Sequence, residues 1–380
     1  MTDEELHGHL VDQQGSRGNL NTPVLVIDRA ALDRNIAALA RFAAGQAVSL
    51  RPHAKTHKSP DIARRQLAAG AIGISCAKIG EAEVLADDGV REGLLLTSPV
   101  VSAPAIARLA ALNLRTNRLM CVVDNIENVE ALGTAANRSG KRLRVIIDID
   151  PGIHRTGVGS AEAAVALFRA ITAEDGLHYS GVQFYCGMQQ HIPGFTARRD
   201  AMAERVDYLG TIVDALTAAG GRPEIVTGGG TGTHRIDSAL GLFTELQAGS
   251  YVFMDAEYAA CDLTGDGSPP FETALLVDAR VISANTDGLV TLDAGIKAFS
   301  TDAGEPVVVA GAPPGSTYRF MGDEHGALRL PDDGSLPIGH IVTLATPHCD
   351  PTVNLYDTYH VVEGHTLRAL WPVAARGRSR

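Results

Sequence analysis

Between residues 48 and 248 the sequence alternates between short apolar segments and stretches with the three- to four-residue periodicity of a helix. The apolar segments lie at residues 48–51, 73–77, 93–96, 119–123, 143–149, 181–185, 224–226 and 245–248. Eight strands, each followed by a helical segment, are typical of a closed (β/α)8 barrel of the TIM type. We therefore predict that barrel as the main domain, with an open, doubly wound parallel sheet as the alternative.

The pattern changes near Pro269 and Pro270, where helical periodicity stops and β-like segments follow one another. These segments lie at residues 274–283, 288–293, 317–321 and 341–345, and turns rich in glycine, proline and aspartate separate them. The change predicts a second, all-β domain in the C-terminal part of the chain. We accordingly expect an N-terminal tail (residues 1–21), a barrel (29–268) and a β-domain (269–380).

Composition and charge argue against several classes of protein. The formal net charge is −11, which disfavours a broad surface for nucleic acid or for an anionic membrane. No segment approaches the ~18 consecutive apolar residues of a membrane-spanning helix, and the polar residues 1–21 lack the apolar core of a signal peptide. The five cysteines include no CxxC pair, so no disulfide scaffold is expected. We expect a cytoplasmic protein.

Lys55 lies just after the first predicted barrel strand, within a run of basic residues. Barrel enzymes place their chemistry at the carboxyl ends of the strands. A nucleophilic lysine needs a nearby cation or an apolar pocket, so that part of it remains a free amine. The basic neighbours that could act in this way are Arg51, His53, His57 and Lys58. On spacing alone a solvated basic loop is the favoured alternative, because lysine is normally exposed.

A glycine-rich segment, TGGGTGTH, begins at Thr227 and follows the seventh predicted strand. Its glycines allow backbone N–H groups to approach an anion closely, and a helix is expected directly after it. Barrels often bind phosphate after strands seven and eight. The eighth strand is followed by Gly249, Ser250 and Tyr251, which add an N–H group and two hydroxyls. We predict a phosphate site here, with a glycine-rich turn that binds no ligand as the alternative.

His348 and Asp350 are the candidates for a metal site. If this segment is extended, the two side chains point to one face and Cys349 points to the other. An imidazole and a carboxylate with open positions suit an exchangeable Mn2+ or Mg2+ better than a structural Zn2+. A lone His-x-Asp is a weak signal, and a polar loop between two prolines is the alternative. The acidic segment 322–326 (GDEHG) could line the same site.

Three further residues follow predicted barrel strands: Arg155 after the fifth, and Tyr185 and His191 after the sixth. Each stands where the catalytic residues of barrels stand. Considered one at a time, a surface arginine, a buried tyrosine and a loop histidine are the simpler interpretations.

In combination these motifs resemble those of the fold-type III pyridoxal-phosphate enzymes, in the branch of D-threonine aldolases and metal-dependent D-serine dehydratases. The lysine run, the HRTGV segment that begins at His154, the glycine-rich loop, the GSY segment and the HCD segment occur in the family's order. The resemblance extends from Thr22 to about Val373. It implies an alanine-racemase-like architecture, in which residues 22–28 join the C-terminal β-domain, and it implies a homodimer.

The resemblance also implies a role for each candidate residue. Lys55 would bind pyridoxal 5'-phosphate as a Schiff base, Arg155 would lie by the cofactor ring, and Tyr185 would line its pocket. The residues around the phosphate would be Thr227, Gly230, Thr231, Gly249, Ser250 and Tyr251. His348 and Asp350 would bind Mn2+ or Mg2+. His191 would be the general base, with a metal-bound hydroxide as the rival.

The residue two positions after the metal histidine separates the subgroups of this branch. Dehydratases resemble His-x-Cys, whereas the aldolases resemble His-Cys-Asp, and here that residue is Asp350. The LDAG segment that ends at Gly295, together with Lys297, is also similar to the aldolases. The implied reaction is that of a lyase: cleavage of a D-β-hydroxy-α-amino acid of the D-threonine, D-allo-threonine or D-phenylserine type to glycine and an aldehyde. Dehydration of D-serine or D-threo-3-hydroxyaspartate is the main alternative, followed by an amino-acid racemase or a non-catalytic carrier of the cofactor.

Overall fold

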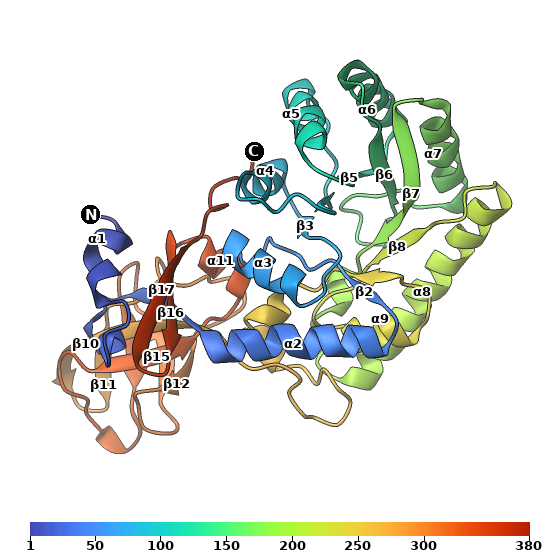
Figure 1. The fold of residues 1–380 in the computed structure, drawn as a ribbon. Coiled ribbons are helices and arrows are strands. Elements are labelled where there is room, and N and C mark those ends of the chain that lie inside the picture. The colour runs from blue at the N-terminus through green and yellow to red at the C-terminus, as the bar shows by residue number, and fades with distance from the viewer. The chain divides into compact units, whose positions relative to one another are not determined.

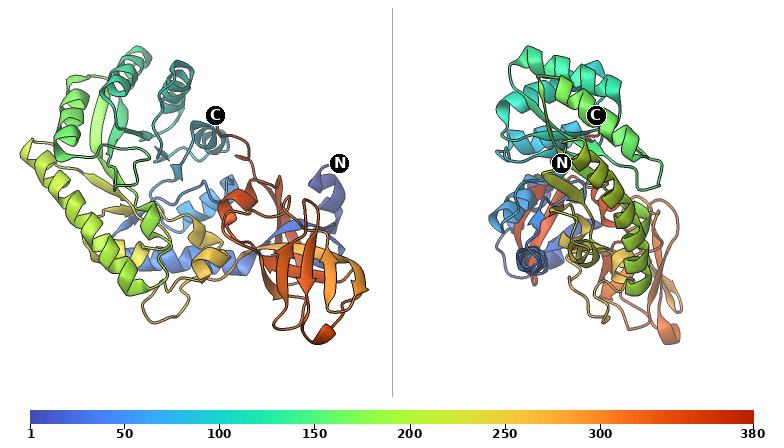
Figure 2. Two further views of the ribbon diagram at one scale, coloured as in Figure 1. Left: turned by 180° about the vertical axis from the view of Figure 1, so that it is seen from behind. Right: turned by 90° about the vertical axis from the view of Figure 1, so that its right-hand side faces the viewer.

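The computed structural model describes residues Met1–Arg380, which form two compact units. The barrel unit comprises residues 37–249, 261–268 and 377–380, and the β unit comprises residues 1–36, 250–260 and 269–376. Figure 1 labels many of the elements of each unit, and Figure 2 shows them from two further directions. None of the helices combines the length and the apolar character that crossing a membrane requires.

Eight parallel strands form the sheet of the barrel unit, in the order β2-β9-β8-β7-β6-β5-β4-β3. Their bounds are β2 Ser49–Leu50, β3 Ser75–Cys76, β4 Leu95–Leu96, β5 Met120–Val123, β6 Leu143–Asp148, β7 Leu177–Phe184, β8 Ile225–Gly228 and β9 Glu245–Leu246. A parallel bridge between His53 and Ser75 joins the segment after β2 to β3, so the two outer strands of the sheet also meet. The predicted fold class is confirmed, and the open sheet is wrong.

Helices accompany the strands of this sheet: the first helix precedes β2, and each of the others follows one of the strands β2 to β8. They are α2 Arg29–Gly45, α3 Pro60–Ala68, α4 Ile79–Asp87, α5 Ala103–Arg115, α6 Ile126–Ser139, α7 Ala161–Ala173, α8 Phe195–Ala218 and α9 His234–Ala239. In α5 the side chains of Ile106, Leu109 and Leu112 recur every three residues and are buried. All four residues of β5 are buried, as expected for a parallel strand with a helix layer on one face and the barrel interior on the other.

The β unit is built on a nine-stranded sheet. Its strands are β1 Val24–Asp28, β10 Leu275–Thr286, β11 Leu289–Leu292, β12 Val307–Ala310, β13 Thr317–Phe320, β14 Gly326–Arg329, β15 Ile341–Ala345, β16 Thr358–Glu363 and β17 Thr366–Pro372. Strand β1 lies between two C-terminal strands, antiparallel to β10 and parallel to β16. Two short helices, α10 (Ala256–Ala259) and α11 (Cys349–Val353), also belong to this unit.

The first 21 residues are folded onto the β unit. They contain α1 (Asp3–His7) and two turns of 3-10 helix, and Leu10 and Leu20 share a hydrophobic cluster with Val24 of β1. Arg17 makes a bidentate ion pair with Asp278 of β10, with N–O distances of 2.7 and 2.8 Å. The N-terminal segment therefore contributes both apolar and ionic contacts to the sheet.

A buried ion pair ties the first barrel strand to the last. Arg51 follows β2 and contacts both carboxylate oxygens of Glu245 in β9 at 2.8 Å, and each side chain is 3% exposed. We expect Arg51→Ala to lower the free energy of unfolding by about 3–5 kcal/mol, because Glu245 is left buried and unpaired. The double variant Arg51→Met/Glu245→Leu should lose much less, since no charge then remains buried. Urea denaturation of both variants checks this, and equal losses would contradict it.

Candidate active site

Lys55 lies in the loop between β2 and α3, at the carboxyl end of a barrel strand, and is half-buried. Its backbone N–H donates to His53 Nδ1 at 3.3 Å, and His53 Nε2 is 3.0 Å from the hydroxyl of Thr97. Because most of this loop is buried, the solvated basic loop is wrong as an interpretation.

Two of the cations expected to influence Lys55 are matched by carboxylates instead. Arg51 pairs with Glu245, and Lys58 is buried with its Nζ 2.5 Å from Glu81 Oε1. Because each positive charge faces a negative one, neither acts as an unbalanced cation beside Lys55. Arg51 and Lys58 therefore stabilise the loop through their ion pairs. His53 and His57 remain as the polar neighbours of Lys55.

The glycine-rich segment forms a tight loop between β8 and α9. Gly229 has a φ of 70°, a conformation that favours glycine. A Cβ atom on Gly230 would lie 2.4 Å from Gln190 Oε1, and one on Gly232 would lie 2.0 Å from the Gln190 carbonyl oxygen. The glycines are therefore required in part by the packing of Gln190 against the loop.

A buried polar cluster that the sequence did not predict supports this loop. The Thr233 hydroxyl donates to Asp237 Oδ2 at 2.5 Å, and it accepts hydrogen bonds from Gln190 Nε2 and from the Gly230 N–H. The Gly232 N–H donates to Gln190 Oε1 at 3.1 Å. Two N–H groups of the loop thus bind side chains within the protein. Burial raises the pKa of the Asp237 carboxyl to about 7.

Arg155 and Tyr185 lie at the carboxyl ends of β6 and β7 and contact each other. The Arg155 guanidinium carbon is 5.6 Å from the centre of the Tyr185 ring, a cation–π contact. Both side chains line a small pocket that also includes Asp148 and Thr156. Two sequence candidates after different strands are therefore brought together.

A layer of buried polar side chains crosses the barrel at the same end. Gln183 of β7 donates to Asp148 Oδ1 at 2.8 Å, and Gln247 donates both to Gln183 and to the hydroxyl of Thr227. Thr156 donates to Asp148 Oδ2 at 2.7 Å, and burial raises the pKa of that carboxyl to about 6. The sequence signal was present, because these polar residues end or follow otherwise apolar strands.

The remaining candidates of the cofactor site divide between the two units. In the barrel unit, Thr231 is buried in the glycine-rich loop, and Gly249 follows β9. A Cβ on Gly249 would lie 2.6 Å from the Thr56 hydroxyl, so the backbone after β9 runs against the lysine loop. His191 is half-buried in the loop after β7. Ser250 and Tyr251, also buried, belong to the β unit.

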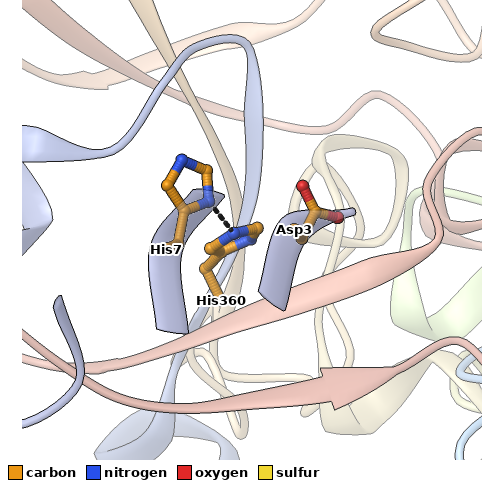
Figure 3. A group of neighbouring side chains, drawn as sticks. All are labelled: Asp3, His7 and His360. Carbon is orange, nitrogen blue, oxygen red and sulfur yellow. Dashed lines mark hydrogen bonds between the residues drawn. The ribbon is translucent and has the colours of Figure 1, made fainter. Parts of the chain in front are cut away.

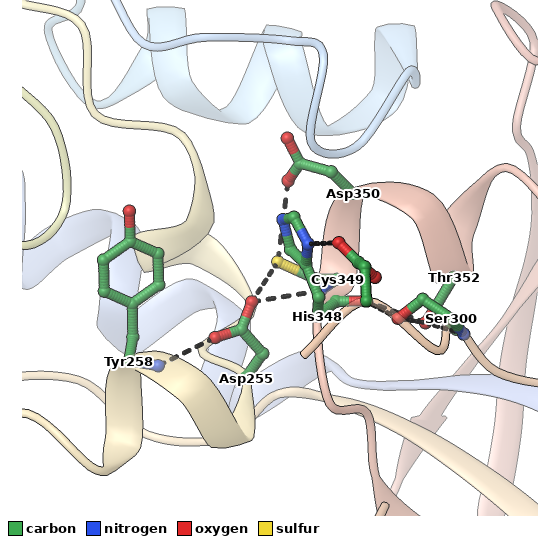
Figure 4. Close-up of polar contacts among 8 residues, drawn as sticks. Asp255, Tyr258, Ser300, His348, Cys349, Asp350 and Thr352 are labelled. Atoms are coloured by element: carbon green, nitrogen blue, oxygen red, sulfur yellow. Dashed lines mark hydrogen bonds and ion pairs between the residues drawn. The ribbon is translucent and has the colours of Figure 1, made fainter. Parts of the chain in front are cut away.

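From the sequence we considered an extended conformation for the His348–Asp350 segment. In the structure this segment instead begins a helix. His348 is the N-cap, with φ −138° and ψ 126°, and α11 starts at Cys349. Cys349 is fully buried, and its thiol donates to Asp255 Oδ2 at 3.1 Å. Burial raises the pKa of this thiol well above its ordinary value. Figure 4 shows the imidazole and the Asp350 carboxylate on the same side of the helix start. The accessible donors are therefore nitrogen and oxygen, not sulfur.

In the acidic segment 322–326, residues 322–325 form an exposed turn after β13, and Gly326 is the buried first residue of β14. Its Glu324 pairs with Lys297, with 2.5 Å between Oε1 and Nζ. Its predicted place beside the metal site remains a prediction.

A second group of metal-capable side chains, Asp3, His7 and His360, joins α1 to β16 (Figure 3). The Asn21 N–H donates to His7 Nε2 at 3.0 Å, so the His7 proton lies on Nδ1. Nδ1 then donates to His360 Nε2 at 2.8 Å, and His360 Nδ1 donates to the Leu25 carbonyl. Both imidazole lone pairs accept hydrogen bonds. We interpret the group as a clasp that holds the N-terminal segment to the sheet, rather than as a metal site.

We expect acid to weaken this clasp, because protonation of His7 and His360 opposes the hydrogen bonds that they make. Burial lowers the pKa of both imidazoles from 6.5, that of His360 to about 4. The unfolded chain therefore binds protons that the folded chain excludes, so the stabilisation is complete above pH 6.5 and is lost as the pH falls towards 4. Urea denaturation at pH 7.5 and pH 5 should show a smaller acid loss for His7→Leu than for the unchanged protein. His9→Leu, at an exposed neighbouring position, should lose as much stability between pH 7.5 and pH 5 as the unchanged protein. If His7→Leu loses the same amount, the clasp is excluded.

Two family models match the chain. Residues 27–257 match the alanine racemase N-terminal domain, and residues 274–362 match a domain described as a putative serine dehydratase domain. The chain is 36% identical to a 3-hydroxy-D-aspartate aldolase of Paracoccus denitrificans (strain Pd 1222), over 94% of this chain and 93% of that protein. It is 35% identical to a D-threonine aldolase of an Arthrobacter species over 100% of both chains.

A solved structure agrees with these matches. The D-threonine aldolase of Filomicrobium marinum is 38% identical and superimposes with a TM-score of 0.91, covering 96% of this chain and 97% of that one. These relatives are lyases that cleave carbon–carbon bonds, and they match the barrel and the β unit together. The chain therefore belongs to the family of the alanine racemase N-terminal domain, in the branch that contains the D-threonine and 3-hydroxy-D-aspartate aldolases.

Proposed function

We propose that this protein is a pyridoxal-phosphate- and divalent-metal-dependent aldolase that cleaves D-β-hydroxy-α-amino acids to glycine and an aldehyde. The observation that most favours this reaction over dehydration is the burial of the Cys349 thiol. Its thiol is buried against Asp255, whereas His348 and Asp350 offer an imidazole and a carboxylate. Nitrogen and oxygen donors with open positions suit Mn2+ or Mg2+, and a thiolate would have suited Zn2+.

The barrel residues fit pyridoxal phosphate. Lys55 is half-buried at the end of β2, and Gly249 allows the backbone after β9 to run close to the lysine loop. Arg155 and Tyr185 form a flat cationic and aromatic wall at the same end of the barrel. We assign Lys55 to the covalent link with the cofactor, and Thr227, Gly230, Thr231, Gly249, Ser250 and Tyr251 to its phosphate.

Bound pyridoxal phosphate supplies an electron sink for the pair left at Cα when the Cα–Cβ bond breaks. We assign His348 and Asp350 to a divalent cation, which when bound would supply Lewis-acid chemistry. His191 is the base that we assign to the β-hydroxyl proton, because it stands at the carboxyl end of β7. Proton removal from the hydroxyl, with the electron pair of the Cα–Cβ bond moving towards Cα, releases the aldehyde. We also expect a homodimer in the cytoplasm.

Product analysis with D-threonine tests the reaction directly. With Mn2+ present, we expect glycine and acetaldehyde in equal amounts. Appearance of 2-oxobutyrate and ammonia would instead identify a dehydratase, and L-allo-threonine would identify a racemase. A protein that binds the cofactor and leaves D-threonine unchanged would be a carrier, or an aldolase for another substrate.

A second substrate distinguishes those last two cases. The 36% identity to a 3-hydroxy-D-aspartate aldolase makes 3-hydroxy-D-aspartate the compound to test beside D-threonine. Cleavage would give glycine and glyoxylate, whereas dehydration would give oxaloacetate and ammonia. If both compounds remain unchanged, aldolase activity on the two substrates of the named relatives is refuted. If either is cleaved, the ratio of the two kcat/KM values defines which β-substituent is preferred.

A further inference from the structure

The His348 imidazole has a carboxylate partner outside the His-Cys-Asp motif. Its Nδ1 lies 2.7 Å from Oδ2 of Asp302, a residue 46 positions earlier in the chain. We propose that Asp302 is a positioning residue of the metal site, which fixes the tautomer and the ring orientation of His348. The inference rests on the proposed function, in which His348 and Asp350 bind the metal.

The short distance between His348 Nδ1 and the Asp302 carboxylate determines which imidazole nitrogen can bind a cation. A carboxylate accepts hydrogen bonds, so the proton of the neutral imidazole lies on Nδ1. The lone pair of Nε2 is then the one that a metal can use. Without Asp302 the ring could rotate and exchange tautomers, and only some of the molecules would present Nε2 correctly.

The backbone carbonyl of His348 is held by hydrogen bonds from two other segments. The carbonyl of His348 accepts from the Ser300 hydroxyl at 3.1 Å and from the Thr352 hydroxyl at 2.8 Å. The Ser300 N–H in turn donates to the Thr352 hydroxyl at 3.0 Å. The segment that carries Asp302 is thereby fastened to the backbone of His348 and to α11 (Figure 4).

The first residue of α11 is anchored separately. The N–H of Cys349 donates to Asp255 Oδ2 at 3.0 Å, and Asp255 is 1% exposed. The other oxygen of Asp255 accepts from the N–H of Tyr258 in α10. On the preceding side, the Pro347 carbonyl accepts from the N–H of Glu257 at 3.3 Å. Because the main chain before and after His348 is held, rotation of the imidazole is the freedom that remains, and the hydrogen bond to Asp302 restrains it.

Asp302 is also suited to mutation, because its side chain is 53% exposed. An exposed ion pair contributes little to folding, so its removal should leave the fold intact. Loss of metal affinity in an Asp302 variant would then report on the site rather than on stability. Glu305, another exposed carboxylate in the same segment, provides a matched control.

The test measures Mn2+ binding to the pyridoxal-phosphate-loaded protein by electron paramagnetic resonance of the free ion, without any turnover. We expect Asp302→Ala to weaken binding by about 10- to 100-fold, the range found when the carboxylate behind a metal histidine is lost. Asp302→Asn should lose less, since the amide oxygen still accepts from Nδ1–H. Glu305→Ala should bind like the unchanged protein, and thermal melting of all variants should be similar.

The coordination itself is followed with Co2+ as the bound ion. A positioning role predicts that Asp302→Asn keeps the visible absorption bands of the unchanged protein, because the set of ligands is the same. New band positions would mean that Asp302 is itself a ligand, which overturns the inference. Unchanged Mn2+ affinity in Asp302→Ala would overturn it as well. His348→Ala separates this failure from that of the proposed function: if that variant also binds Mn2+ normally, the metal site itself is misassigned.

Discussion

Replacing Lys55 with alanine is expected to abolish covalent attachment of the cofactor and to reduce turnover by roughly 10³-fold or more, as when other covalent catalytic groups are removed. The structure offers no simple substitute in the same loop. Lys58, three positions on, is buried in its ion pair with Glu81, so its amine is occupied. Borohydride reduction of the loaded protein, followed by peptide mass spectrometry, identifies the modified lysine.

Lys78 provides the matched control for this experiment. It is an exposed lysine that follows β3, at the same end of the barrel as Lys55. Lys78→Ala should retain both the attached cofactor and the activity. A reduced cofactor on any lysine other than Lys55, or undiminished labelling in Lys55→Ala, would show that our assignment is wrong.

Removing the imidazole of His348 is expected to have the second large effect. The proposed site has two protein ligands, so His348→Ala leaves one, and we expect Mn2+ affinity to fall by about 10²-fold or more. Turnover should fall with it, and EDTA should inactivate the unchanged protein until Mn2+ is restored. Equilibrium dialysis and the rate of glycine formation measure the two effects.

Cys349→Ser distinguishes this site from a thiolate site. Because the Cys349 thiol is buried and donates to Asp255, a hydroxyl in its place keeps a donor to that carboxylate. We expect Mn2+ affinity within about threefold of the unchanged protein, since sulfur is not a ligand. If Cys349→Ser loses the metal while Asp350→Ala retains it, the donor set that we propose is incorrect, and the dehydratase reaction gains support.

Local patterns were sufficient to predict the barrel. Each of the eight predicted strands overlaps an observed one, because a parallel strand buried on both faces appears as a short apolar run. Only β7 differs appreciably, beginning at Leu177 rather than near Gly181. After the buried Leu177, His178 and Tyr179 are partly exposed and Ser180 is polar, so the first half of the strand carries little apolar signal.

Residues 348–350 do not have the extended conformation that we considered, and a sequence signal for the observed helix start was present. Asp350 and Pro351 occupy the first turn of α11, where an acidic side chain is favourable and a missing N–H costs little. A helix start was therefore as consistent with the sequence as a strand. The extended interpretation followed from the preceding β-like segment. It placed Cys349 away from the other two side chains, and in the structure this thiol is buried against Asp255.

The partners of the site residues could not be predicted at all, because they are distant in the sequence. Glu245 is 194 positions from Arg51, and Asp302 is 46 from His348. Spacing along one chain contains no information on such pairs. The basic run around Lys55 was read as a set of free charges for this reason, whereas folding supplies a carboxylate to two of them.

The position of β1 in the middle of the C-terminal sheet has a consequence during synthesis on the ribosome. His7 and its partner His360 are 353 positions apart, so the first segment of the chain emerges long before the strands that flank it. At about 5–20 residues per second the wait is on the order of 20–70 s. Until residues 275–286 have emerged, the apolar run Val24–Asp28 has neither β10 nor β16 to pair with, and it lacks β16 for the whole of that time. We therefore expect the N-terminal segment, rather than the barrel, to be the part of the nascent chain that most needs a chaperone.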